Sequence, residues 1–109
     1  MKMIFRPEVL EYFNELSTIL YEKDYFGFEE DAMKYVDDLM NDIKTTLHSR
    51  QKRLAPSYFD KYGKNMHYSV FRRSRQTQWY IFFTIYDYKG EIVYLIRYIS
   101  NNHMTAQYL

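Results

Sequence analysis

Apolar and polar residues alternate along the first half of the chain with the period of an α-helix. After a short apolar stretch at residues 1–5, which predicts a first strand, apolar side chains recur every three or four positions over residues 7–22. Pro7 suits the first turn of a helix, where its missing N–H has no partner to lose, and Glu8 lies favourably at the positive end. The same period returns over residues 28–50. The pattern therefore predicts a strand followed by two amphipathic helices.

The second half of the chain changes to the shorter period of β-strands. Residues 50–65 carry no regular pattern and contain Pro56 and Gly63, so a basic loop is predicted there. Beyond this loop, β-branched and aromatic residues dominate and the period falls towards two. The strands predicted from this pattern cover residues 66–74, 77–87 and 91–100, with a turn around Gly90.

The order of these elements, β-α-α-β-β-β, predicts an α+β fold. Two N-terminal helices are expected to pack on one face of a mostly antiparallel, four-stranded twisted sheet. The chain has 109 residues, of which 47% are hydrophobic, so residues 1–109 suit a single domain with its own core. The absence of Cys leaves no disulfide framework and no thiolate metal site.

Alternation within the strands predicts which side chains face the core. In the first of the three later strands, Tyr68, Val70 and Arg72 form the more apolar set, so Arg73 is expected on the open face. In the middle strand, the expected core side comprises Trp79, Ile81, Phe83 and Ile85. The remaining aromatic residues of that strand would look outward, either towards a partner or as a second packing layer; they are Tyr80, Phe82 and Tyr86.

Arg97 does not fit a simple assignment of faces in the last strand. It shares its parity with three apolar residues, Val93, Leu95 and Ile99. Either Arg97 is buried and paired, or these apolar side chains face the open side. Periodicity leaves both arrangements open.

Charge divides the chain into two halves, although the net charge is only +1. Residues 1–48 hold five basic and eleven acidic groups, whereas residues 49–109 hold ten basic and three acidic groups. Either the basic half meets a polyanionic partner, or acidic helices complement a basic sheet within one fold. No apolar run approaches the ~18 residues of a membrane helix, and charges interrupt the N-terminus too early for a signal peptide. We therefore expect a cytoplasmic protein without a membrane partner.

The stretch IFRPE at residues 4–8, at the end of the first strand, resembles the opening of RelE/ParE-type toxins. The two helices, the basic loop, the three-stranded meander and a C-terminal His103 and Tyr108 follow in the same order as in that family. The resemblance covers essentially the whole chain and rests on pattern rather than on an invariant motif. It implies the toxin of a type II toxin–antitoxin pair, with a cognate antitoxin as partner. RelE-like members cut messenger RNA on the ribosome, whereas ParE-like members poison DNA gyrase and lack the RNA-cutting residues.

Metal-independent RNA cleavage requires a group that removes the 2′-OH proton, a cation for the phosphate charge and an acid for the leaving oxygen. Arg73 is the candidate cation, because a guanidinium is planar and permanently charged. The resemblance makes His103 and Tyr108 the candidates for base and acid, in an order that stays open. These C-terminal groups match the family by order rather than by spacing. Their alternative role is a polar cap over a finished core.

No cofactor or metal is expected, because the three His residues have no metal-ligand spacing and the chain has no Gly-rich phosphate loop. The YoeB-like branch of the family takes its base from a Glu before the meander, and residues 43–59 contain no Glu or Asp. This departure weakens a mechanism of that kind.

Five further basic residues are candidate contacts to nucleic acid: Arg50, Lys52, Arg53, Arg72 and Arg75. The first three also suit the negative end of the second helix, and the last two also suit a hairpin tip that discourages edge pairing. Three functions follow from the resemblance. The first is a ribosome-dependent endoribonuclease acting on messenger RNA, the second a non-catalytic inhibitor of DNA gyrase, and the third a protein-binding module that kept the fold without toxicity.

Overall fold

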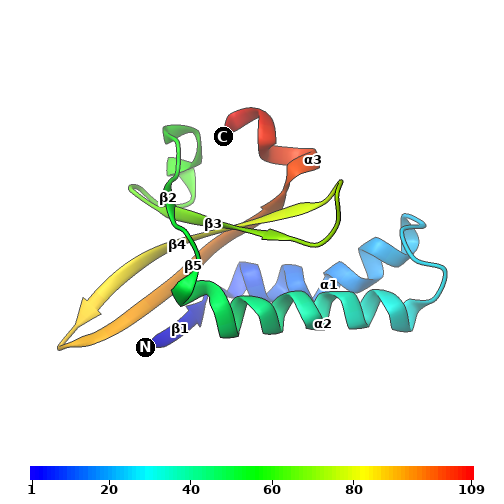
Figure 1. Ribbon diagram of the computed structural model, residues 1–109, viewed down its shortest axis with the longest axis horizontal. Coiled ribbons are helices and arrows are strands. Elements are labelled where there is room, and N and C mark those ends of the chain that lie inside the picture. The colour runs from blue at the N-terminus through cyan, green and yellow to red at the C-terminus, as the bar shows by residue number, and fades with distance from the viewer.

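Two long helices lie side by side along one face of a twisted sheet (Figure 1). This computed structural model describes all residues, 1–109. Helix α1 spans Pro7–Glu22, which are the predicted bounds. Helix α2 spans Glu29–Thr46 and continues into a short 3₁₀ turn, η1, at Leu47–Ser49. Three acidic residues in the first turn of α2 and Lys44 in its last turn both complement the helix dipole.

The sheet has five strands in the order β1-β5-β4-β3-β2. Strand β1 pairs parallel with β5, and the other three pairs are antiparallel. The α+β class is confirmed. The sheet differs in detail from the predicted four strands, because β2 adds a fifth strand and β1 makes the sheet mixed. The strands are β1 (Lys2–Phe5), β2 (Arg53–Leu54), β3 (His67–Arg72), β4 (Gln78–Tyr88) and β5 (Glu91–Asn101).

Three short elements lie where the sequence pattern predicted no helix or strand. Strand β2 has two residues, Arg53 and Leu54, which pair with Tyr68 and His67 of β3. After β5 the chain turns into a four-residue helix, α3 (Asn102–Thr105), and a 3₁₀ turn, η3, at the C-terminus (Figure 1). Elements this short span too few residues to show a period, so the hydrophobic pattern does not reveal them.

The main core lies between the two helices and the sheet. It contains Leu16 from α1 and Leu39 and Ile43 from α2, packed against aromatic and aliphatic side chains of β3, β4 and β5. The prediction for β4 is confirmed at three positions, Trp79, Ile81 and Phe83, and is wrong at Ile85, which is exposed. Strand β3 ends its pairing at Phe83, so the outer part of β4 extends beyond the neighbouring strand and the main core.

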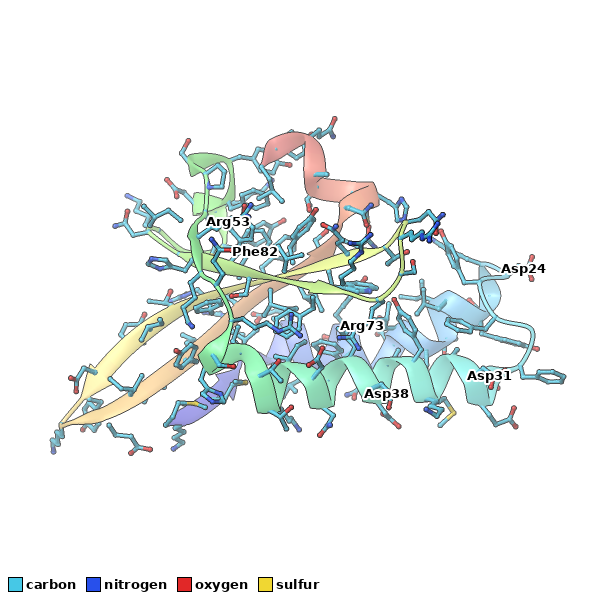
Figure 2. All side chains as sticks on the ribbon, in the orientation of Figure 1. Asp24, Asp31, Asp38, Arg53, Arg73 and Phe82 are labelled. Carbon is cyan, nitrogen blue, oxygen red and sulfur yellow. The ribbon has the colours of Figure 1, made fainter.

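The opposite face of the sheet is also covered, by a second cluster of five buried residues: Phe59, Met66, Tyr68, Tyr80 and Phe82. Phe59 comes from a 3₁₀ turn, η2, at Ser57–Lys61, and stacks on Phe82 at 4.5 Å between ring centroids. Figure 2 shows Phe82 on the side of the sheet that carries the β2–η2 segment. Tyr80 and Phe82 therefore form a second packing layer rather than an open aromatic surface.

The faces predicted for β3 are reversed. Phe71 belongs to the main core beneath the helices, whereas Tyr68 belongs to the second cluster on the opposite face. The more apolar set was assigned to the main core, but both sets contain buried residues because both faces of β3 are covered. Arg73, which has the parity of Phe71, accordingly lies on the helix side.

A β-bulge in β5 resolves the conflict at Arg97. Phe82 pairs with Tyr98 and Phe83 pairs with Ile96, so Arg97 is the extra residue without a partner on β4. The bulge shifts the alternation by one, and Ile96 and Ile99 both enter the main core. The guanidinium of Arg97 donates from Nε to Thr84 Oγ1 (2.9 Å) and from a terminal nitrogen to the Tyr86 hydroxyl (2.8 Å). Neither predicted alternative holds, because Arg97 is half-buried without a carboxylate partner and Ile99 faces the core.

We expect Leu39→Ala to lower the free energy of unfolding by about 2–5 kcal/mol, because truncating a fully buried side chain leaves a cavity in the main core. Leu54→Ala is the matched control, since Leu54 is 70% exposed, and its effect should stay within about 0.5 kcal/mol. Urea denaturation followed by circular dichroism measures both. Equal losses in the two variants would contradict the assignment of the core.

Candidate functional site

Asp42 of α2 holds two arginines that approach it from different elements. Arg50, just beyond the helix, donates to Asp42 Oδ2 at 2.9 Å, and Arg73, just beyond β3, donates to the same oxygen. Arg50 also donates to Thr46 Oγ1 (2.9 Å) and to the Val70 carbonyl oxygen (3.0 Å). One carboxylate thus joins the end of α2 to the end of β3.

This arrangement corrects the expectation that Arg73 lies on an open face. Figure 2 shows Arg73 between the sheet and α2, and its side chain is only 19% exposed. Its Nε is buried without a hydrogen-bond partner. Burial by itself raises the pKa of Asp42, but hydrogen bonds from Thr46 and Arg50 and the charges of Arg50 and Arg73 outweigh it and lower the pKa overall. Arg73 and Arg50 therefore act in this structure as partners of Asp42.

The five predicted nucleic-acid contacts divide into two groups. Arg50 is committed to Asp42, and Lys52 donates from Nζ to the carbonyl oxygens of His48 and Arg50, each at 3.0 Å, at the end of the helical segment. These contacts satisfy the last carbonyls of the helical segment. The other three, Arg53, Arg72 and Arg75, are exposed and have no carboxylate within 4.0 Å.

His103 lies on α3 and is exposed. It lines a groove of about 550 Å³ between α1, the α1–α2 connection, the β3–β4 hairpin and α3, together with Ser74 and Thr77 of that hairpin. Two amides position this helix. The Asn101 side chain accepts from the His103 N–H (3.0 Å), and Asn102 Oδ1 accepts from the Gln78 N–H (2.9 Å). The C-terminal amides thus cap α3 and anchor it to β4.

Tyr108 occupies a different environment. Its ring stacks on Tyr58 with the centroids 3.7 Å apart and the planes within 4°. Hydrogen bonding to the Tyr58 hydroxyl raises the pKa of Tyr108, so the phenol stays protonated at neutral pH. Lys61 lies with its Nζ 4.2 Å from the centroid of the Tyr58 ring. Tyr108 does not line the groove that holds His103, and Arg73 lines neither that groove nor the stack. Arg73, His103 and Tyr108 are therefore not brought together around one hollow.

A second hollow, which we call the tyrosine cleft, lies where α1, η2, β5 and α3 meet. It encloses about 500 Å³, and its chemically distinct residues are Arg6, Tyr12, Lys61, Tyr62, Arg97 and Tyr98. The rings of Tyr62 and Tyr98 stack with their centroids 3.8 Å apart. Burial, with hydrogen bonding to Tyr98, raises the pKa of Tyr62 to about 12.

Sequence reasoning missed the tyrosine cleft as a site. Its residues come from four separate segments, and the bulge that turns Arg97 to this side is not visible in the hydrophobic pattern. The only available signal was the misfit of Arg97 in its strand. No three of the His, Asp and Glu side chains are placed to hold a metal ion. No helix combines the length and the apolar character that crossing a membrane requires.

Comparisons with known proteins give no relative for this chain: no protein-family model, no curated protein and no solved structure matches it.

We expect Asp42→Asn to destabilise the protein by about 1–3 kcal/mol, because it leaves two guanidinium groups side by side without a counter-charge. The partial exposure of all three side chains keeps the loss below that of a fully buried pair. Asp38→Asn is the matched control, since the Asp38–Lys34 pair on the same helix is exposed and should contribute less than about 0.5 kcal/mol. Chemical denaturation at pH 7 compares the two. A similar loss in both variants would show that the Asp42 pairs add nothing.

The lowered pKa of Asp42 gives its stabilisation a defined pH dependence. The contribution is complete above the ordinary Asp value, about 3.9, and is lost as the pH falls through the lower value of the folded state. The free energy of unfolding of the wild type should therefore fall more steeply below about pH 4 than that of Asp42→Asn. Denaturation curves at pH 7, 4 and 2.5 measure the difference. Parallel pH profiles would contradict the lowered pKa.

Proposed function

We propose that the protein is a toxin of the RelE/ParE type that acts by binding a nucleic-acid-containing target, without cutting RNA through Arg73, His103 and Tyr108. The observation that carries this proposal is the separation of those three residues. Arg73 lies against Asp42 under the helices, His103 lines a groove beside the hairpin, and Tyr108 stacks on Tyr58. Cleavage needs a cation, a base and an acid around one phosphodiester.

The distribution of charge supports a polyanionic target. Within the basic half of the chain, only Arg50 and Arg73 pair with a carboxylate, and both use Asp42. The alternative, that acidic helices complement a basic sheet within one fold, therefore accounts for two basic groups. The other basic groups have no carboxylate partner, and Arg53, Arg72 and Arg75 are among them. Exposed cations without a carboxylate partner are the groups that replace counterions on a phosphate backbone. Arg53 of β2 lies on the side of the molecule away from Asp38 of α2 (Figure 2), and Arg72 and Arg75 lie at the end of β3 and in the β3–β4 hairpin.

In this proposal the partners are a cognate antitoxin, as the family resemblance implies, and DNA gyrase with its DNA as target. A ParE-like toxin needs no general base, so the separation of the three residues is no obstacle to it. A protein-binding module without toxicity is the outcome that remains if expression has no effect on growth.

A ribosome-dependent endoribonuclease is the second candidate. One observation favours it: the exposed imidazole of His103 shares a groove with Ser74 and Thr77, which flank the hairpin tip that carries Arg75. The imidazole of a His side chain can act as a general base in such a reaction. In that mechanism Arg72 and Arg75, rather than Arg73, would supply the positive charge.

Inducible expression in bacterial cells distinguishes the candidates. We expect growth arrest with DNA damage, intact messages in 5′-end mapping, and recovery when the adjoining antitoxin gene is co-expressed. The double variant Arg72→Ala/Arg75→Ala should lose the arrest, because two phosphate-directed charges are gone. Lys89→Ala, which removes an exposed charge at the far hairpin turn, should keep it. His103→Ala should also keep it.

Two results would overturn the binding proposal. New message ends that disappear in His103→Ala would establish the endoribonuclease in its place. Absence of growth arrest, with the folded protein present at the level of a control toxin, would exclude both toxins.

A further inference from the structure

The tyrosine cleft contains a cation that the fold positions but does not neutralise. The β-bulge turns Arg97 to this side of the sheet, where Thr84 and Tyr86 accept from its guanidinium. No Asp or Glu carboxylate lies within 4.0 Å of it. Two neutral hydroxyls orient the guanidinium and leave its charge uncompensated. An oriented guanidinium of this kind suits a carboxylate or a phosphate, because its planar donors match their oxygens.

The backbone of Gly63 lies close to the Arg97 side chain. A Cβ at this position would lie 2.6 Å from Arg97 Cδ and 3.0 Å from Nε, so only glycine lets the loop backbone approach this closely. The side chain of Arg97 is therefore confined between the loop after η2 and the hydroxyls of β4. Because the Arg97 side chain is already confined, less conformational entropy is lost when a ligand binds.

Charge in the cleft is positive on balance. Lys61 has no carboxylate partner, and its Nζ lies 5.5 Å from the centroid of the Tyr62 ring. Arg6 pairs with Glu8 at 3.2 Å, which is the only carboxylate among the lining residues. The phenol of Tyr62 is a neutral donor at pH 7. Two uncompensated cations and neutral donors favour an anion that carries more than one negative charge.

The rest of the lining is aromatic and aliphatic. Tyr62 and Tyr98 stack nearly parallel, with 6° between their planes, and Tyr12 enters from α1. Val9, Ile99 and Met104 complete the apolar part. The volume of about 500 Å³ falls within the range of small-ligand sites, about 300–1,000 Å³. A ligand that fits both parts has a planar apolar ring system joined to a compact anionic group.

We propose that the tyrosine cleft binds a small phosphate monoester with an aromatic ring system, of the nucleoside monophosphate class. The phosphate lies between Arg97 and Lys61, and the ring system lies against the tyrosines. Binding here does not depend on toxicity, because none of Arg72, Arg75 and His103 lines the cleft.

Isothermal titration calorimetry with the full chain tests this site, using adenosine 5′-monophosphate, adenosine and inorganic phosphate as probes. We expect saturable binding of the monophosphate, at least tenfold tighter than that of adenosine or of phosphate alone. Lys61→Gln, a change at an exposed side chain, should weaken the monophosphate about tenfold. Lys89→Gln is the matched control outside the cleft and should leave the affinity unchanged.

The variant Gly63→Ala distinguishes the effect of the position of Arg97 on binding from the effect of its charge. The added methyl group must displace the guanidinium while its charge remains, so we expect weaker monophosphate binding with unchanged affinity of the protein for heparin. Circular dichroism and thermal melting verify that each variant is folded. The proposal is overturned if the monophosphate does not saturate the protein at millimolar concentration, if adenosine binds equally well, or if folded Lys61→Gln and Gly63→Ala both bind like the wild type. None of these results bears on growth arrest.

Discussion

One extra residue in β5 determines the arrangement on both sides of the sheet. Ile96 and Ile99 are three positions apart, so in a regular strand they would point to opposite faces. The bulge at Arg97 brings both into the main core, opposite the helices. It also turns Arg97 to the other face, against Gly63 and the hydroxyls of β4. A straightened β5 would have to remove one isoleucine from the core or the arginine from the cleft, so core packing and the position of this cation are coupled.

Charge pairing adds a second connection between the layers. Asp42 joins α2 to the ends of two segments that follow in the chain, through Arg50 and Arg73. Among the remaining cations of the basic half, Lys52 and Arg97 are half-buried and donate to oxygens of the fold, whereas Arg53, Arg72 and Arg75 are exposed. Asp38 of α2 and the exposed Arg53 of β2 lie on different sides of the molecule (Figure 2).

Coverage of both sheet faces changes the significance of the high aromatic content. Phe59 from a five-residue turn and Phe82 from β4 build a second cluster where an open binding surface was one expectation. Accessible aromatic groups outside the two clusters include the stack of Tyr58 with Tyr108 and the tyrosine cleft, together with exposed side chains such as Phe28 and Tyr88. The tyrosine cleft and the groove that His103 lines both lie at element junctions, where several segments contribute their lining residues.

The sequence by itself determined the features that depend on local periodicity: the bounds of α1, the long second helix, the three later strands, the α+β class and the buried set of Trp79, Ile81 and Phe83. Periodicity within one helix or strand assigns its side chains to two faces, and this assignment holds in the folded protein as well. The tertiary structure decided which face of each strand packs against the helices. Alternation in β3 separated Phe71 and Arg73 from Tyr68 and Arg72, but with both faces covered it could not say which set met the helices. The bulge at Arg97 exists only through pairing with β4, and Asp42 meets Arg73 across 31 positions of sequence. Contacts between residues so far apart in the sequence depend on how the elements pack together, and the periodicity within a single element carries no information about that packing.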